Sequence, residues 1–161
     1  MIAYVIEWMG PYNDGDVISD DLEMGIYMIT GKLKNRHYNQ IHYFGISKNI
    51  VSSRIINGHH KKPLVNRNRI YWIGEIKSHK TVTREDLERV EHVFIQYLKH
   101  GLINEKKTKS LPQNLIILNN WFKKSGDVRK NKKYIGQTIP DVIFWDGEFW
   151  QTSYKLGFEL D

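Results

Sequence analysis

Two short segments near the start of the chain are rich in residues that favour β-strands. They cover residues 24–33 and residues 41–46. Glycine, lysine, asparagine and arginine lie between them at residues 31–36, a composition typical of a polar loop. This pattern predicts a β-hairpin with a long tip.

A short helix and a third strand are predicted after this hairpin. Asn49 can cap a helix that Gly58 ends, and Arg54 lies on its more polar side. Residues 59–63 have the composition of a basic turn, and the apolar run at residues 70–76 predicts a strand. Strands and helices are therefore expected to be interleaved along the chain.

The strongest helix signal begins at Thr83, an N-cap paired with Asp86, and ends at Gly101. Apolar residues repeat at helical spacing, and Glu91 falls on the same face. Burying an unpaired carboxylate is costly, so Glu91 is expected to need a cation, either an arginine or a metal ion. The alternative is a structural salt bridge or a position at the edge of the stripe, which is the commoner case.

Two further β elements are predicted beyond this helix. Residues 115–118 indicate a strand or a buried segment. Residues 142–145 and 148–152 flank Asp146-Gly147, whose residue types favour the positive φ angles of a tight turn. A C-terminal β-hairpin is expected there.

Length and composition limit the class of protein. The chain has 161 residues, of which 40% are hydrophobic, which suits one compact core. It has no cysteine, which excludes a disulfide framework, a thiolate zinc site and a cysteine nucleophile. No apolar run is long enough to span a bilayer, so a soluble, cytoplasmic protein is expected.

Charge is segregated along the chain. Residues 1–31 carry six acids and no lysine or arginine, whereas residues 32–80 carry a net charge of +10 and residues 99–133 a net charge of +8. Basic segments of this kind bind polyanions through phosphate neutralisation and counterion release. Nucleic acid is the expected partner, and a solubilising basic surface is the alternative.

Together these residues resemble a known family. The chain is similar to the GIY-YIG nuclease superfamily over residues 24–105. The resemblance rests on Gly25-Ile26-Tyr27, Tyr43-Phe44-Gly45, Arg54, Glu91 and Asn104. It implies an α/β domain of the α+β type, with a small three-stranded antiparallel sheet flanked by helices, to which the C-terminal hairpin is an extension. It also implies cleavage of DNA with a divalent metal.

The resemblance implies a role for each residue. Glu91 would bind one Mg²⁺ or Mn²⁺, and Arg54 would clamp the scissile phosphate. Tyr27 would be the general base, with its pKa lowered by a nearby basic residue such as Lys34 or Lys48. Tyr43 would hydrogen-bond the attacking water or the phosphate.

Two further residues belong to the implied site. His59 would assist proton transfer or contact phosphate, and it is a better candidate than His60 because of its spacing from Arg54. A solvated basic loop is the alternative for both histidines. Asn104 would brace the active-site loop, or act only as a local backbone cap. A later Tyr134-Ile135-Gly136 is interpreted as a chance match, because it follows Glu91 in the chain.

The predicted organisation has three parts. Residues 1–23 are an acidic N-terminal extension, residues 24–105 are the nuclease core, and residues 106–161 are a basic loop and hairpin packed on the same domain. The partner is expected to be double-stranded DNA, and a homodimer would allow both strands to be cut. A noncatalytic DNA-binding or regulatory module is the alternative function. A zinc protein is disfavoured, since the seven histidines form no recognisable ligand clusters.

Overall fold

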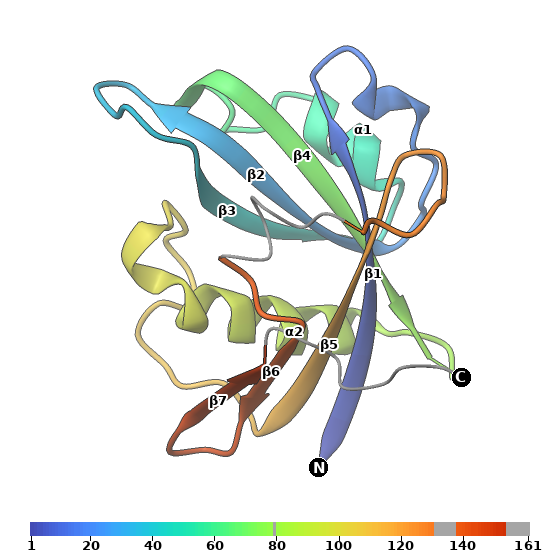
Figure 1. The fold of residues 1–161 in the computed structure, drawn as a ribbon, viewed down its shortest axis with the longest axis vertical. Coiled ribbons are helices and arrows are strands. Elements are labelled where there is room, and N and C mark those ends of the chain that lie inside the picture. The colour runs from blue at the N-terminus through green and yellow to red at the C-terminus, as the bar shows by residue number, and fades with distance from the viewer. Residues whose placement is uncertain (79, 131–137, 154–161) are drawn as a thin grey trace.

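The chain folds into one curved sheet with two helices (Figure 1). The computed structural model describes residues 1–78, 80–130 and 138–153, and the elements below are those of the described residues. In chain order they are β1 (Ile2–Tyr12), η1 (Val17–Ser19), β2 (Gly25–Leu33), β3 (Gln40–Ser47), α1 (Val51–Ile56), β4 (Val65–Lys77), α2 (Arg84–Tyr97), η2 (Lys99–Gly101), β5 (Leu115–Phe122), β6 (Val142–Trp145) and β7 (Trp150–Ser153).

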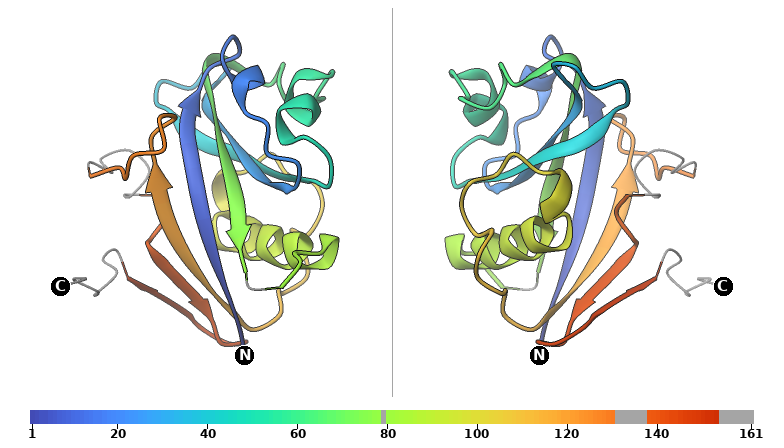
Figure 2. Two further views of the ribbon diagram at one scale, coloured as in Figure 1. Left: turned by 90° about the vertical axis from the view of Figure 1, so that its right-hand side faces the viewer. Right: turned by 90° about the vertical axis from the view of Figure 1, so that its left-hand side faces the viewer.

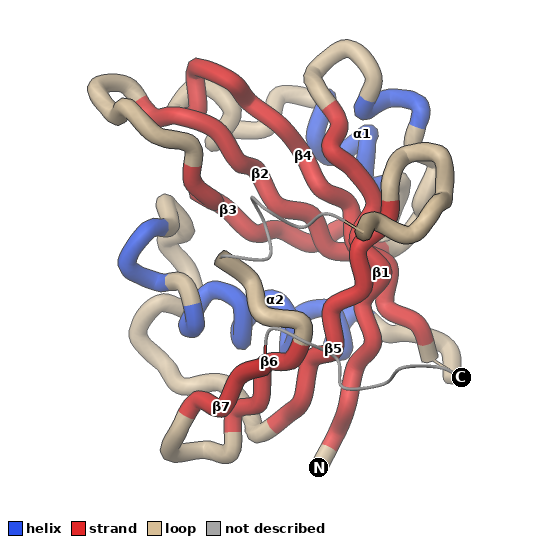
Figure 3. Tube along the Cα trace, viewed as in Figure 1, coloured by secondary structure: helices blue, strands red, loops and turns tan. Residues whose placement is uncertain are grey.

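The described part of the sheet has seven strands in the order β3-β2-β4-β1-β5-β6-β7. Its neighbouring strands are antiparallel except β1 and β5, which are parallel. The predicted small three-stranded sheet flanked by helices is therefore wrong. The predicted three strands exist as β2, β3 and β4, but they form only one part of a strongly curved mixed sheet in which strand predominates over helix (Figure 3).

Strand β1 explains much of this difference. It lies within residues 1–23, the segment interpreted as an acidic extension, and it pairs with β4 on one side and β5 on the other. Tyr4, Ile6 and Trp8 alternate with less buried residues, as expected for a strand with one face in the core. Trp8 stacks on Trp121 of β5 with ring centroids 5.6 Å apart. The parallel β1–β5 pair thereby joins the C-terminal strands to the rest of the sheet.

The two helices pack on opposite faces of β2. Ile26 and Met28 belong to a core shared with α2, whereas Tyr27 and Ile29 belong to a core shared with α1. In Figures 1 and 2, α2 lies within the curve of the sheet and α1 lies on the far side of β2 and β3. Successive side chains of a strand point to opposite faces, so neighbouring residues of the Gly25-Ile26-Tyr27 motif serve different cores.

Most of the predicted local elements are confirmed, but α2 ends at Tyr97, before the expected Gly101, which lies in η2. Thr83 and Asp86 form a reciprocal capping box at the start of α2. Strands β6 and β7 pair as a hairpin around Asp146-Gly147, and Gly147 has φ +106°. Helix α1 begins one residue later than expected, because Ile50 rather than Asn49 is the residue before its first turn. Tyr134-Ile135-Gly136 lies outside the described residues.

A search of the described residues for a helix that is both long and apolar enough to cross a membrane finds none.

Candidate functional site

A cavity of about 410 Å³ lies beside the edge strand β3, where α1, α2 and the loop after η2 approach one another. Five of the six residues selected from the sequence line it, and they come from five different segments of the chain. They are Tyr27, Tyr43, Arg54, Glu91 and Asn104. The sixth, His59, contacts the cavity-lining Tyr27. The structure therefore brings together all of the selected residues.

The glycine of the Tyr43-Phe44-Gly45 motif makes room for the first tyrosine. Tyr27 and Gly45 are directly paired across β2 and β3. A Cβ atom on Gly45 would lie 2.5 Å from both Cζ and Oη of Tyr27 and 2.8 Å from Cε1 of Tyr43. Any side chain at this position would displace both tyrosines, so the glycine sets the position of the two rings.

Tyr27 and His59 form a buried hydrogen-bonded pair on one wall of the cavity. The Tyr27 hydroxyl lies 2.7 Å from Nε2 of His59, and both side chains are buried. The backbone N–H of Lys61 donates to Nδ1 of His59 at 3.2 Å. A neutral imidazole that accepts at Nδ1 carries its proton on Nε2, so His59 donates to the Tyr27 oxygen.

Burial keeps this pair neutral in the free protein. Burial and the neighbouring Tyr43 raise the pKa of Tyr27 above its ordinary value of 10.0, while the positive charge of Arg54 opposes that shift. Burial also lowers the pKa of His59 to about 4, with smaller contributions from His60 and Arg54. Arg54 is thus the cation that acts on Tyr27, a role that the sequence interpretation gave to a lysine.

The two adjacent histidines take different positions. His59 is buried and also packs edge-on against Tyr43, with ring centroids 5.0 Å apart. His60 stacks on the outer side of His59 at 5.2 Å, is exposed and lines the cavity. The sequence favoured His59 over His60 for proton transfer or phosphate contact; the structure places His59 against both tyrosines and His60 at the cavity surface.

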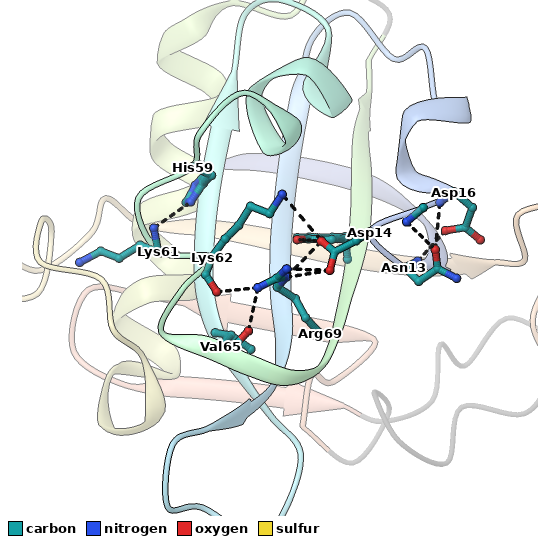
Figure 4. A network of polar contacts seen from close by, with 10 residues as sticks. Asn13, Asp14, Asp16, His59, Lys61, Lys62, Val65 and Arg69 are labelled. Atoms are coloured by element: carbon teal, nitrogen blue, oxygen red, sulfur yellow. Dashed lines mark hydrogen bonds and ion pairs between the residues drawn. The ribbon is translucent and has the colours of Figure 1, made fainter.

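The loop that carries His59 is fastened to the end of β1 (Figure 4). Arg69 of β4 donates to the carboxylate of Asp14 at 2.7 Å and to the carbonyl oxygen of Lys62 at 2.7 Å. Tyr71 donates to the same carboxylate at 2.6 Å. The Lys62 N–H in turn donates to the carbonyl of His59. Sequence reasoning missed Asp14 and Arg69, because their contact joins a loop and a strand that are far apart in the chain.

Glu91 of α2 and Lys107 form an ion pair at the same cavity. The Glu91 side chain is 13% exposed, and its Oε2 lies 2.5 Å from Nζ of Lys107. Burial raises the pKa of Glu91, and Lys107 opposes that shift. Glu91 faces inward as expected, and its partner is Lys107 rather than the expected arginine or metal ion, so the contact is the structural salt bridge given as the alternative.

Asn104 braces the outer edge of β3. Its side-chain oxygen accepts from the Phe44 N–H at 3.1 Å, and its amide nitrogen donates to the Phe44 carbonyl at 2.8 Å. The N–H of Ile103 donates to the carbonyl of His42 at 2.7 Å. Asn104 therefore satisfies backbone groups of an edge strand beside Tyr43, in agreement with its predicted bracing role.

The rim of the cavity is predominantly basic. Lys61 pairs with Glu105 and Arg84 with Glu88, each at 2.6 Å. Arg54 also lines the cavity, as does Lys106, and both are exposed and make no ion pair with the described residues. These cations are available to an anionic ligand such as a phosphate.

The donor atoms suit a hard divalent ion whose coordination is completed by substrate. Glu91 offers a carboxylate in a confined position that a cation already occupies. No group of three or more candidate metal ligands comes together within the described parts of the chain. Mg²⁺ characteristically uses one or two carboxylates together with waters and phosphate oxygens, so a single protein ligand is chemically sufficient.

The chain matches no protein-family model, no curated protein and no solved structure.

Proposed function

We propose that the protein is a divalent-metal-dependent endonuclease that hydrolyses phosphodiester bonds in DNA. One observation carries this proposal: Tyr27, Tyr43, Arg54, Glu91 and Asn104, selected from the sequence as a set, line a single cavity. Residues chosen for an unrelated reason would be scattered over the surface and core of a sheet this large. Their convergence supports a shared chemical task.

Each residue of the site has a separate role in the proposed hydrolysis. The exposed guanidinium of Arg54 binds the scissile phosphate and stabilises its developing charge through paired N–H donors. Tyr27 loses its hydroxyl proton to bulk solvent and then accepts the proton of the attacking water, and the Nε2–H of His59 stabilises the intermediate phenolate oxygen. Glu91 would hold the divalent ion, which when bound would supply charge neutralisation for the reacting phosphate.

DNA is favoured as substrate by the charge of the chain around this cavity. Residues 32–80 contribute Arg54 and Lys61, and residues 99–133 contribute Lys106 and Lys107, and these two segments carry net charges of +10 and +8. A polyanion that crosses the cavity would contact both segments. Binding should therefore weaken steeply with salt, as expected for phosphate contacts that release counterions.

A noncatalytic DNA-binding module is the second candidate, and a specific observation favours it. The Tyr27 hydroxyl is buried, and its pKa lies above the ordinary value, which opposes its use as a base. A scaffold that has kept the basic rim and lost the chemistry would bind DNA without cutting it.

Nicking of supercoiled plasmid by wild type, Arg54→Ala and Glu91→Ala in Mg²⁺ and Mn²⁺ separates the two functions. Wild type is expected to nick, and both variants to bind DNA without nicking it. Glu85→Ala is the matched control, because Glu85 is an exposed carboxylate of α2 that pairs with Arg89 and does not line the cavity. Wild type that binds DNA but nicks with neither metal would favour the noncatalytic module.

A further inference from the structure

Lys107 occupies the position at Glu91 that a bound cation would take. Its Nζ lies 2.5 Å from Oε2 of Glu91 and 3.2 Å from the backbone carbonyl oxygen of Glu88, one turn earlier on α2. The ammonium group therefore has two oxygen partners at the cavity wall. Both are oxygen donors of the kind that hard divalent ions prefer.

The backbone of Lys107 is held in a conformation that directs its side chain to this position. Its φ is +59°, in the left-handed region that residues other than glycine rarely adopt. The amide of Gln96, also on α2, donates to the Lys107 carbonyl at 2.6 Å. Asn104 fastens the same loop to β3 three residues earlier. Such strain persists only where the surroundings impose it, and it is concentrated at functional sites.

A divalent ion and the Lys107 ammonium compete for this oxygen. Mg²⁺ binds a carboxylate oxygen at about 2.1 Å. An ammonium 2.5 Å from the same Glu91 oxygen would then lie close enough to the ion for the two positive charges to repel each other. Binding of the ion requires the side chain of Lys107 to leave Glu91, and the cavity offers substrate phosphate as its alternative partner.

We propose that Lys107 is an internal counter-ion that competes with the divalent ion for Glu91, so that metal binds weakly until DNA draws the lysine away. This inference rests on the proposed function, because it takes Glu91 as the metal ligand. It makes Lys107 a regulator of metal loading rather than a direct participant in hydrolysis.

The test measures Mn²⁺ binding without DNA, by the electron paramagnetic resonance signal of free Mn²⁺ at one fixed pH. Lys107→Met keeps the aliphatic stem and removes the charge, and it is expected to lower the Kd for Mn²⁺ by about tenfold relative to wild type. Lys109→Met is the matched control, because Lys109 is an exposed residue of the same loop that does not line the cavity and makes no ion pair with the described residues. Its Kd should equal that of wild type.

Glu91→Gln distinguishes failure of this inference from failure of the proposed function. If Mn²⁺ binding depends on Glu91 but is no tighter in Lys107→Met, the counter-ion role is overturned and the metal site stands. If Glu91→Gln and Lys107→Met both bind Mn²⁺ as wild type does, the counter-ion role of Lys107 and the assignment of Glu91 as the metal ligand are both overturned. Should Lys107→Met not fold, as judged by circular dichroism, Lys107→Gln makes the same comparison with a smaller change in polarity.

Discussion

A buried polar pair and a half-buried ion pair lie at the same cavity, and they differ in charge. Tyr27 and His59 are held neutral by burial, whereas Glu91 and Lys107 form an ion pair. Burial favours the uncharged form of a side chain that has no oppositely charged partner. A side chain that has such a partner can stay charged in a buried position, as part of an ion pair. The neutral Tyr27–His59 pair can therefore change its protonation when a charged ligand enters the cavity. The Glu91–Lys107 pair can exchange its ammonium group for another cation.

The largest expected effect comes from removing the hydroxyl group of Tyr27. In Tyr27→Phe we expect plasmid nicking to fall by about a thousandfold with DNA affinity unchanged, since the proton acceptor is lost and the basic rim is intact. Single-turnover nicking and a DNA-binding titration measure the two quantities. Tyr38→Phe, at an exposed tyrosine, is the control. Nicking by Tyr27→Phe at the wild-type rate would exclude Tyr27 from the chemistry.

A substitution at Gly45 should disturb the Tyr27–His59 pair without changing either of these residues. In Gly45→Ala the new methyl group would lie 2.5 Å from the Tyr27 hydroxyl, so the free energy of unfolding in urea should fall by about 3 kcal/mol. Gly101→Ala is the matched control, because its Cβ would come no closer than 3.9 Å to a neighbouring atom. Equal stabilities of the two variants would contradict the close packing of Tyr27 on Gly45.

The pH dependence of stability should report the suppressed ionisation of His59. The unfolded side chain binds a proton below its ordinary pKa of 6.5, whereas the folded one does so only near pH 4. Between these values the unfolded state binds more protons, so lowering the pH reduces the free energy of unfolding. We expect about 2 kcal/mol of that loss to come from His59.

Urea unfolding of wild type and His59→Gln at pH 7 and pH 4.5 isolates this contribution. Other titrating groups act equally in both proteins, so the drop in stability should be smaller in the variant. Identical drops would mean that His59 is protonated as readily in the folded state as in the unfolded state.

The smallest expected effect concerns Asn104, which braces β3, the strand that carries Tyr43. Asn104→Ala removes two hydrogen bonds to Phe44 and should cost about 1 kcal/mol of stability. It should also speed amide hydrogen exchange at Phe44. Asn114→Ala is the control, because Asn114 donates to the carbonyl of Asp146, away from β3. Unchanged exchange at Phe44 would remove Asn104 from its bracing role.

The local elements and the selected residues could be predicted because their signals are short-range. The Thr83–Asp86 capping box and the Asp146-Gly147 turn are encoded within a few residues. The inward position of Glu91 follows from the 3.6-residue period of α2. These features require no knowledge of how distant segments pair.

The extent of the sheet could not be predicted in the same way. The alternation of Tyr4, Ile6 and Trp8 is a strand signal, but its acidic surroundings led to its interpretation as an extension. The parallel pairing of β1 with β5 joins residues more than a hundred positions apart, and no local pattern specifies it. Lys107 was missed for a related reason, because one lysine in a basic loop has no sequence feature that marks its contact with Glu91.

A crystal structure of the protein with Ca²⁺ and a DNA duplex tests the central claim most directly, because Ca²⁺ commonly supports binding without cleavage. A backbone phosphate should lie in the cavity against the guanidinium of Arg54, with the ion on Glu91 and the side chain of Lys107 turned away from that carboxylate. DNA bound on another face of the sheet, with the Glu91–Lys107 ion pair intact, would contradict the assignment of this cavity as a nuclease site.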